Sequence, residues 1–229
     1  MKKKKIVVLT GAGISAESGV KTFRDADGLW EGYDIEQVAT PYGFNKDPEL
    51  VLNFYNGLRK QLKDVQPNPA HLLLAELEKD YNVVVITQNV DDLHERAGSS
   101  NIIHLHGELL KMRGVDDPYT FYDCTEDIKV GDLSPSGVQL RPHIVWFGED
   151  VPMIVKAAEE VETANIVLII GTSLQVYPAA GLMNYAEKGT PIYYVDPRPS
   201  ISSKNNITVI KDVASTGVAK AIELIKDLK

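Results

Sequence analysis

Short runs of consecutive apolar residues recur along the chain, and the longer segments between them carry apolar residues at helical spacing. Continuous apolar runs are typical of parallel strands that are covered on both faces. These runs predict strands at 6–10, 82–87, 101–105, 165–170, 191–195 and 207–210. An i, i+3, i+4 repeat predicts helices at 47–64, 69–79, 151–163, 178–188 and 213–228. Because strands and helices alternate, we expect an α/β fold with a Rossmann-like, doubly wound parallel sheet.

The segment 112–140 follows neither pattern. It is rich in aspartate, contains prolines and glycines, and has only weak periodicity. Long structureless stretches are uncommon inside a compact domain. We therefore expect a small inserted module or long loops here, and not a layer of the sheet.

Composition narrows the class of protein. The 229 residues include 24 Lys and Arg against 32 Asp and Glu, a net charge of −8, which argues against a nucleic-acid partner. No apolar run approaches the roughly 20 residues of a membrane-spanning helix, and the run behind the lysines at 2–5 is too short for a signal peptide. The single cysteine, Cys124, excludes an intrachain disulfide and a four-cysteine zinc site. We expect a cytoplasmic protein without a membrane partner.

A glycine motif follows the first predicted strand directly. Gly11, Gly13 and Ala16 fit the G-x-G-x-x-G/A pattern, in which the backbone approaches the pyrophosphate of a dinucleotide. A tight turn that needs small residues is the alternative. The acidic residue that normally follows about 20 positions later has no clear counterpart. A long polar and aromatic loop through Trp30 stands there instead and is suited to close over a ligand.

Two further polar segments stand at the ends of predicted strands, the edge where α/β sheets bind ligands. In segment 87–92 (TQNVDD), Asn and Asp side chains suit an amide or a ribose, but Asp91 or Asp92 would equally cap a short helix. Segment 171–173 (GTS) suits phosphate or ribose contacts, with a simple turn as the alternative.

Three polar residues, His104, His106 and Glu108, are spaced two apart. In a strand they would share one face, which makes a metal site conceivable, although nothing nearby completes the usual four ligands. A single histidine acting as general base fits better, because its pKa lies near neutral pH. A structural role is the alternative, and it suits His104.

Together these motifs resemble the sirtuin family of NAD-dependent protein deacylases, most closely its short bacterial, desuccinylase-like class. The matching segments follow the family order: 11–30, 87–99, 104–109, 141–149 and 171–182. The resemblance implies NAD-dependent removal of acyl groups, foremost acetyl, from protein lysines, giving nicotinamide and O-acyl-ADP-ribose. It also implies one catalytic domain, 1–229, with an NAD-binding part at about 1–30, 64–110 and 141–229 and a small module at about 31–63 and 111–140.

The resemblance assigns roles residue by residue. His106 matches the catalytic general base, and Asn89 is assigned to catalysis with it. The implied NAD-binding residues are Gly11, Ala12, Gly13, Ser15, Glu17, Thr22, Phe23, Arg24, Gln88, Asn89, Val90, Asp91, Gly171, Thr172, Ser173, Asp196 and Ala214. The implied neighbours of the acyl-lysine and its peptide are Tyr55, Val145, Phe147 and Gly148.

The chain departs from the family pattern in three places. Most members hold a zinc with four cysteines, whereas Cys124 stands alone, so we expect no metal and a module held by packing and turns. Leu58 replaces the arginine of the Tyr-x-x-Arg pattern that begins at Tyr55, and Arg59 lies about 100° further round the helix. That difference argues against a preference for succinyl or malonyl groups. Asp196 replaces a common asparagine and can still accept bonds from ribose hydroxyls.

Other functions remain open at this level. The same pocket would serve mono-ADP-ribosyl transfer or NAD hydrolysis, with a different acceptor. A non-catalytic reader of NAD or acyl-lysine would bind without releasing nicotinamide. A hydride-transferring dehydrogenase fits the residues less well.

Overall fold

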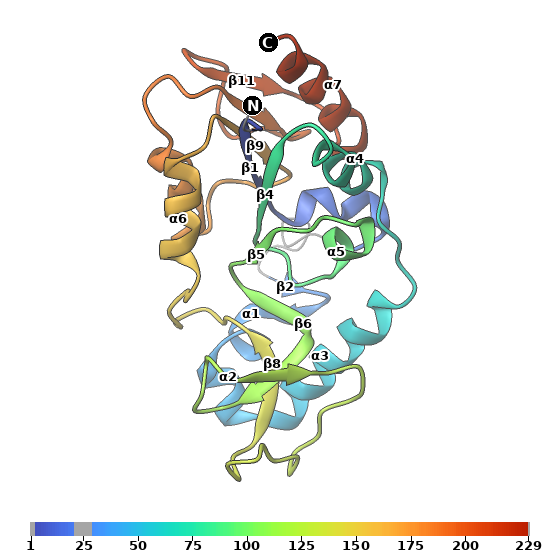
Figure 1. Cartoon of the computed structure of the whole chain (residues 1–229). Coiled ribbons are helices and arrows are strands. Elements are labelled where there is room, and N and C mark those ends of the chain that lie inside the picture. The colour runs from blue at the N-terminus through green and yellow to red at the C-terminus, as the bar shows by residue number, and fades with distance from the viewer. Residues whose placement is uncertain (1–2, 21–28, 229) are drawn as a thin grey trace.

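The fold is seen in a computed structural model that describes residues 3–20 and 29–228 (Figure 1). Its larger part is a six-stranded sheet in the order β11-β10-β9-β1-β4-β5, and every pairing in it is parallel. The strands are β1 (Lys5–Thr10), β4 (Asn82–Thr87), β5 (Ile102–His104), β9 (Ile166–Ile170), β10 (Ile192–Val195) and β11 (Ile207–Ile210). All six predicted strands are present, and the expected Rossmann-like fold is confirmed.

Helices cover both faces of this sheet, as the period-two alternation of β1 requires. Ile6 and Val8 face the layer of α4 (Pro69–Leu77) and α7 (Ala214–Lys226). Val7 and Leu9 face the layer of α6 (Ile154–Glu162) and the 3-10 helix η3 (Ala179–Tyr185). Together the two layers bury the central strand β9 completely and β1 and β4 apart from their first residues.

The predicted α-helix over 178–188 is wrong in type, because the chain forms the shorter 3-10 helix η3. Its buried residues Ala179 and Leu182 are three apart, which is the spacing that a 3-10 helix places on one line. Gly181 also lowers the helical propensity of this segment.

A second, smaller group of elements packs around its own core at the other end of the molecule (Figure 1). It contains an antiparallel sheet in the order β7-β6-β8, a hairpin and three helices. Its elements are β2 (Leu29–Trp30), β3 (Tyr33–Asp34), α1 (Ile35–Val38), α2 (Pro41–Lys46), α3 (Pro48–Leu62), β6 (Gly107–Gly114), β7 (Phe121–Asp123) and β8 (Leu140–Ile144). We call this group the small module.

The expectation that 112–140 holds no sheet layer is therefore wrong in part, since β6 runs into this segment and β7 lies within it. Only one face of such a sheet is covered, so its strands are half polar and give no continuous apolar run. The first and last residues of β7, Phe121 and Asp123, are exposed. None of the described helices is long and apolar enough to cross a lipid bilayer.

Candidate functional site

A cavity of about 450 Å³ lies where the order of the sheet reverses, between β1 and β9. Ligands of open α/β sheets bind in this crevice, outside the carboxyl ends of the strands. The turns after β1, β4, β9 and β10 line the cavity on one side. Helix α3 and segment 144–149 line it from the small module.

The glycines after β1 allow two turns to touch. The Gly11 amide donates to the Ile170 carbonyl at 3.0 Å, and the Gly13 amide donates to the Gly171 carbonyl at 2.8 Å. A Cβ on Gly13 would lie 2.6 Å from the Gly171 Cα, and Gly171 itself has φ +59°. These glycines thus join the turns after β1 and β9 at the floor of the cavity, and their amides are engaged with the protein itself.

A buried hydrogen-bonded network holds the segment after β4 against the turn after β1. The Ser15 hydroxyl donates to Asp91 Oδ2 at 2.9 Å, and Asn89 Nδ2 donates to the Ser15 hydroxyl at 3.1 Å. Asp91 Oδ1 also accepts from the Leu93 amide at 3.2 Å, in the first turn of α5 (Leu93–Ala97). Asp91 therefore serves as a helix cap and as a site residue at once, while Asp92 makes no side-chain cap bond.

Burial raises the pKa of Asp91 to about 6, against the lowering effect of its bonds from Leu93 and Ser15. A carboxyl group with this pKa is mostly ionised at neutral pH but protonates in mild acid. Together with a further hydrogen bond from the Asn89 backbone amide, this network holds Asn89 and Asp91 in place at the cavity wall.

His106 lines the cavity from the short link between β5 and β6. Its Nδ1 lies 3.1 Å from the Gln88 carbonyl oxygen. Because a carbonyl only accepts, Nδ1 carries the proton and Nε2 is the basic nitrogen. Burial lowers the pKa of His106, opposed by the bond to Gln88. The ring is thus neutral near pH 7 and has the protonation state of a general base.

His104 has a different setting, and the two histidines do not share one strand face. Strand β5 ends at His104, so the two-residue alternation stops there. Its Nδ1 lies 3.3 Å from the Asn89 carbonyl, and its Nε2 lies 2.6 Å from Glu95 Oε1. Burial disfavours the charged ring, but the bond and charge of Glu95 prevail and raise the pKa of His104.

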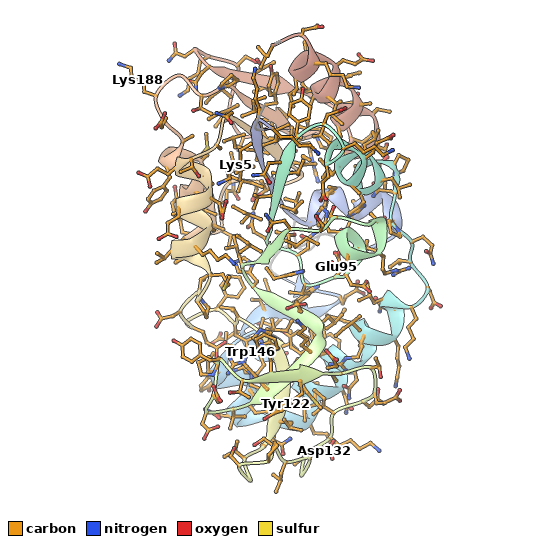
Figure 2. All side chains as sticks on the ribbon, viewed as in Figure 1. Lys5, Glu95, Tyr122, Asp132, Trp146 and Lys188 are labelled. Atoms are coloured by element: carbon orange, nitrogen blue, oxygen red, sulfur yellow. The ribbon has the colours of Figure 1, made fainter. Side chains whose placement is uncertain are left out.

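Within the described part of the chain, Glu95, His104 and Glu108 bring possible ligand atoms within 4.8 Å of one another. Glu95 lies on the near side of α5, above the small module (Figure 2). His104 pairs with Glu95, and Lys111 pairs with Glu108 at 3.0 Å. Each carboxylate of the cluster therefore already has a partner within the protein.

The opposite end of the cavity is closed by the last elements of the chain. Glu17 accepts from the Ser215 amide at 2.8 Å and from the Ser215 hydroxyl at 2.6 Å, which ties the turn after β1 to the start of α7. Ala214 and the buried Asp196 line the cavity beside it. Gln88 Nε2 donates to the Thr172 hydroxyl at 3.1 Å and so joins the turns after β4 and β9.

The small-module wall is built around Tyr55 and Trp146, and Trp146 lies inside this module (Figure 2). The Trp146 indole donates to the Tyr55 hydroxyl at 2.9 Å, and the Arg141 guanidinium stacks 3.2 Å from the ring centre of Trp146. Burial raises the pKa of Tyr55, so its phenol stays neutral. Leu58 lines the cavity, whereas Arg59 points away from it and bonds to the Leu109 carbonyl at 3.1 Å.

Comparison with known proteins settles the family. The Sir2 family profile matches residues 11–178, more than half of the chain. The chain belongs to the Sir2 family. An NAD-dependent protein deacylase of Bacteroides thetaiotaomicron is 56% identical over 97% of this chain and 98% of its own length. One of Helicobacter pylori is 62% identical over 85% of both.

Solved Sir2 structures share the fold. A crystal structure of a Sir2 homolog–NAD complex superposes with a TM-score of 0.86 at 38% identity, covering 99% of this chain and 91% of the other. A structure of Sir2 bound to acetylated peptide superposes with a TM-score of 0.80 at 29% identity, covering 98% and 94%.

Most of the expected Sir2 site residues meet around the single cavity described above. Its lining includes Gly11, Ala12, Gly13, Glu17, Tyr55, Gln88, Asn89, Val90, Asp91, His106, Val145, Phe147, Gly148, Gly171, Thr172, Ser173, Asp196 and Ala214. Ser15 lies behind that lining, in the network with Asp91. Thr22, Phe23 and Arg24 lie outside the described residues.

Sequence reasoning missed several lining residues of the Sir2 site. They include Trp30, Leu62, Val65, Leu109, Ile144, Trp146, Val176, Tyr177 and Arg198. Leu58 and Leu62 lie four apart on α3, a spacing that the helix would show equally if it faced only a core, and Val65 follows three residues after the helix ends. An apolar cavity wall and a core therefore give the same signal.

Proposed function

We propose that this protein removes acyl groups from protein lysines with NAD as co-substrate, releasing nicotinamide and O-acyl-ADP-ribose. Its relatives at 56% and 62% identity are NAD-dependent protein deacylases, and solved relatives hold NAD or an acetylated peptide. The observation that carries the proposal is His106, a neutral imidazole whose Nδ1–H is committed to Gln88 and whose Nε2 is basic.

The cavity suits a dinucleotide. About 450 Å³ is within the range of ligand pockets, and Gly13 lets the turns after β1 and β9 meet at its floor, where a Cβ would collide with the Gly171 backbone. The residues that would hold NAD are those after β1, β4, β9 and β10, with Asn89 and Asp91 at the nicotinamide end. Bound NAD supplies the ribose carbon that accepts the acyl oxygen as nicotinamide leaves.

The residues of this chain then have separate tasks. His106 Nε2 takes a proton from a hydroxyl group within its reach, and the Gln88 carbonyl holds the imidazole in the required tautomer. Asn89 and Asp91 are held in place by Ser15, so their orientation is set before substrate arrives. The small module, through Val145, Phe147 and Gly148, lines the side on which the acyl-lysine peptide would enter.

The acyl end of the cavity favours a neutral group. Leu58 and Leu62 are apolar, Tyr55 stays uncharged, and Arg59 is turned away from this wall. A carboxylate placed here would lose its water without gaining an ionic partner from α3. We therefore assign acetyl and other neutral acyl groups as the preferred substrates, over succinyl.

The test is incubation with NAD and a panel of acetyl, propionyl and succinyl-lysine peptides. Nicotinamide and the unmodified lysine peptide should appear in equal amounts, with acetyl faster than succinyl. Failure with every acyl group, or labelled ADP-ribose on protein without acyl-lysine, would replace deacylation by another NAD reaction.

The acyl preference is tested separately with Leu58→Arg and, as a neutral control of similar size, Leu58→Met. Leu58→Arg should raise the succinyl-to-acetyl rate ratio by about tenfold or more, since a charge-assisted bond is worth about 1.5–3 kcal/mol. Leu58→Met should leave the ratio near that of the wild type. A wild type that already prefers succinyl would refute the role given to Leu58.

A further inference from the structure

A second cavity, of about 280 Å³, lies on the other side of α3. Tyr55 and Leu58 face the first cavity, whereas Arg59 and Lys60 face the second, as expected for adjacent positions about 100° apart on a helix. Lys63, Thr125, Glu126, Asp127 and Lys129 complete its lining. None of these seven residues is part of the NAD and acyl-lysine site.

This cavity is basic in a chain whose net charge is −8. Four of its lining residues are cationic, and two are acidic. Asp127 is already paired with Lys60 at 2.8 Å. An excess of positive charge therefore remains among Arg59, Lys63 and Lys129.

Arg59 is the unusual member, because its guanidinium is buried without a hydrogen bond to any carboxylate of the described residues, and the nearby charge of Asp127 only partly opposes the burial that lowers its pKa. Its side chain is 1% exposed. Nε donates to the Leu109 carbonyl at 3.1 Å, and Nη1 donates to Asn56 Oδ1 at 2.9 Å and to the Glu126 carbonyl at 3.2 Å. All three acceptors are neutral, and Nη2 has no hydrogen-bond partner in the described structure.

A buried guanidinium normally pairs with a carboxylate or a phosphate group, because an unpaired buried charge is costly. Arginine also suits tetrahedral oxyanions, whose oxygens match its fork of donors. We propose that the second cavity binds a small phosphate-type oxyanion, with Arg59 as the anchor and Lys63 and Lys129 at its rim.

The site would fasten the small module, in a chain whose single cysteine is Cys124. Asn56 already binds both the amide and the carbonyl of Ile128, at 3.0 and 2.9 Å. Arg59 and Lys60 also bind this segment, at the Glu126 carbonyl and at Asp127, and an anion beside Arg59 would add a further link through its rim lysines. Since α3 also carries Tyr55 and Leu58, the anion would steady one wall of the acyl site.

The experiment titrates the full-length protein with inorganic phosphate while thermal unfolding is followed. Saturating ADP-ribose is present throughout, so that phosphate cannot act at the NAD site, and sodium chloride of equal ionic strength is the reference. Phosphate should raise the melting temperature with a saturable dependence that chloride lacks.

The double variant Lys63→Gln/Lys129→Gln removes two exposed rim charges and leaves Arg59 in place. This variant should weaken the apparent phosphate affinity by about tenfold or more, because it loses at least one charge-assisted hydrogen bond to the phosphate. The control Lys79→Gln, at an exposed lysine paired with Glu76, should match the wild type. Backbone amide signals of Glu126 and Ile128 should shift on titration.

A phosphate effect equal to that of chloride, or one that the double variant retains in full, would overturn the proposal. Deacylation is measured on separate samples without phosphate or ADP-ribose and should be unchanged in the double variant. Loss of the phosphate effect with retained deacylation would therefore separate this site from the proposed function.

Discussion

Mild acid should destabilise the fold through two neutral histidines that are buried together. His71 on α4 and His94 on α5 meet edge to face, with ring centres 4.9 Å apart. The Asn68 amide donates to His71 Nδ1 at 3.3 Å, and His94 Nε2 lies 3.1 Å from the Thr10 hydroxyl. Among the described residues, the other nitrogen of each ring has no hydrogen-bond partner, and no acidic group acts on the pKa of either ring.

The size of the effect follows from the pKa values. Burial lowers the pKa of His71 from 6.5 to about 4 and that of His94 to about 3. The unfolded chain therefore binds these protons first, so the stability is complete above pH 6.5 and declines as the pH falls towards 4. At about 1.4 kcal/mol per pH unit, each histidine should cost about 2 kcal/mol between pH 7 and pH 5.

Urea unfolding at pH 7 and pH 5 measures this loss, and variants isolate it from other groups. Asp91, for example, acts in the opposite direction, because its raised pKa favours the folded state as the pH falls below about 6. His94→Gln should lower the pH-dependent loss by about 2 kcal/mol relative to the wild type, whatever its effect on stability at pH 7.

A control of opposite sign is available in His104. Its pKa is raised by Glu95, so its contribution is present below pH 6.5 and is lost as the pH rises through the folded value. His104→Gln should therefore make the protein more sensitive to acid than the wild type, not less. Identical pH dependence in the wild type and His94→Gln would refute the buried neutral pair.

Three further predictions concern the site. His106→Ala should lower deacylation by about 100-fold or more, with NAD affinity retained in calorimetry, and retained turnover would exclude His106 as the base. Gly13→Ala should lower the free energy of unfolding by about 1–3 kcal/mol, because its Cβ would overlap the turn after β9. Gly57→Ala is the control: its Cβ would lie in open space on α3, so it should raise the free energy of unfolding by up to about 1 kcal/mol. Glu149→Gln removes the carboxylate that accepts from Arg141 at 2.6 and 3.1 Å. This substitution should raise KM for the peptide more than KM for NAD. Equal changes in the two KM values would contradict the prediction.

The sequence revealed the main sheet because its strands are buried on both faces. Runs such as Ile166–Ile170 have no polar position at all, so a continuous apolar signal identifies them with little ambiguity. The small module gave no such signal, because α1 and α2 have only four and six residues. Their starts were nevertheless visible in principle, since the side chains of Asp34 and Thr40 cap them.

Most residues of the site could be predicted from the sequence, but the arrangement of their side chains could not. The family resemblance distinguished His106 from His104, but their spacing alone did not. In the structure β5 ends at His104, which pairs with Glu95, whereas His106 lies at the cavity. Likewise, the 100° offset on α3 places Arg59 away from the acyl wall, but no local pattern shows that it bonds to the Leu109 and Glu126 carbonyls. Such choices depend on contacts between segments far apart in the chain.

The hydrogen bond between Glu17 and Ser215 joins positions 198 residues apart. The two sides of the cavity that it connects are therefore synthesised at different times. The turn that would cradle the pyrophosphate leaves the ribosome early, but the wall formed by Asp196, Val213 and Ala214 is made last. A nascent or prematurely ended chain lacks that wall and cannot enclose NAD.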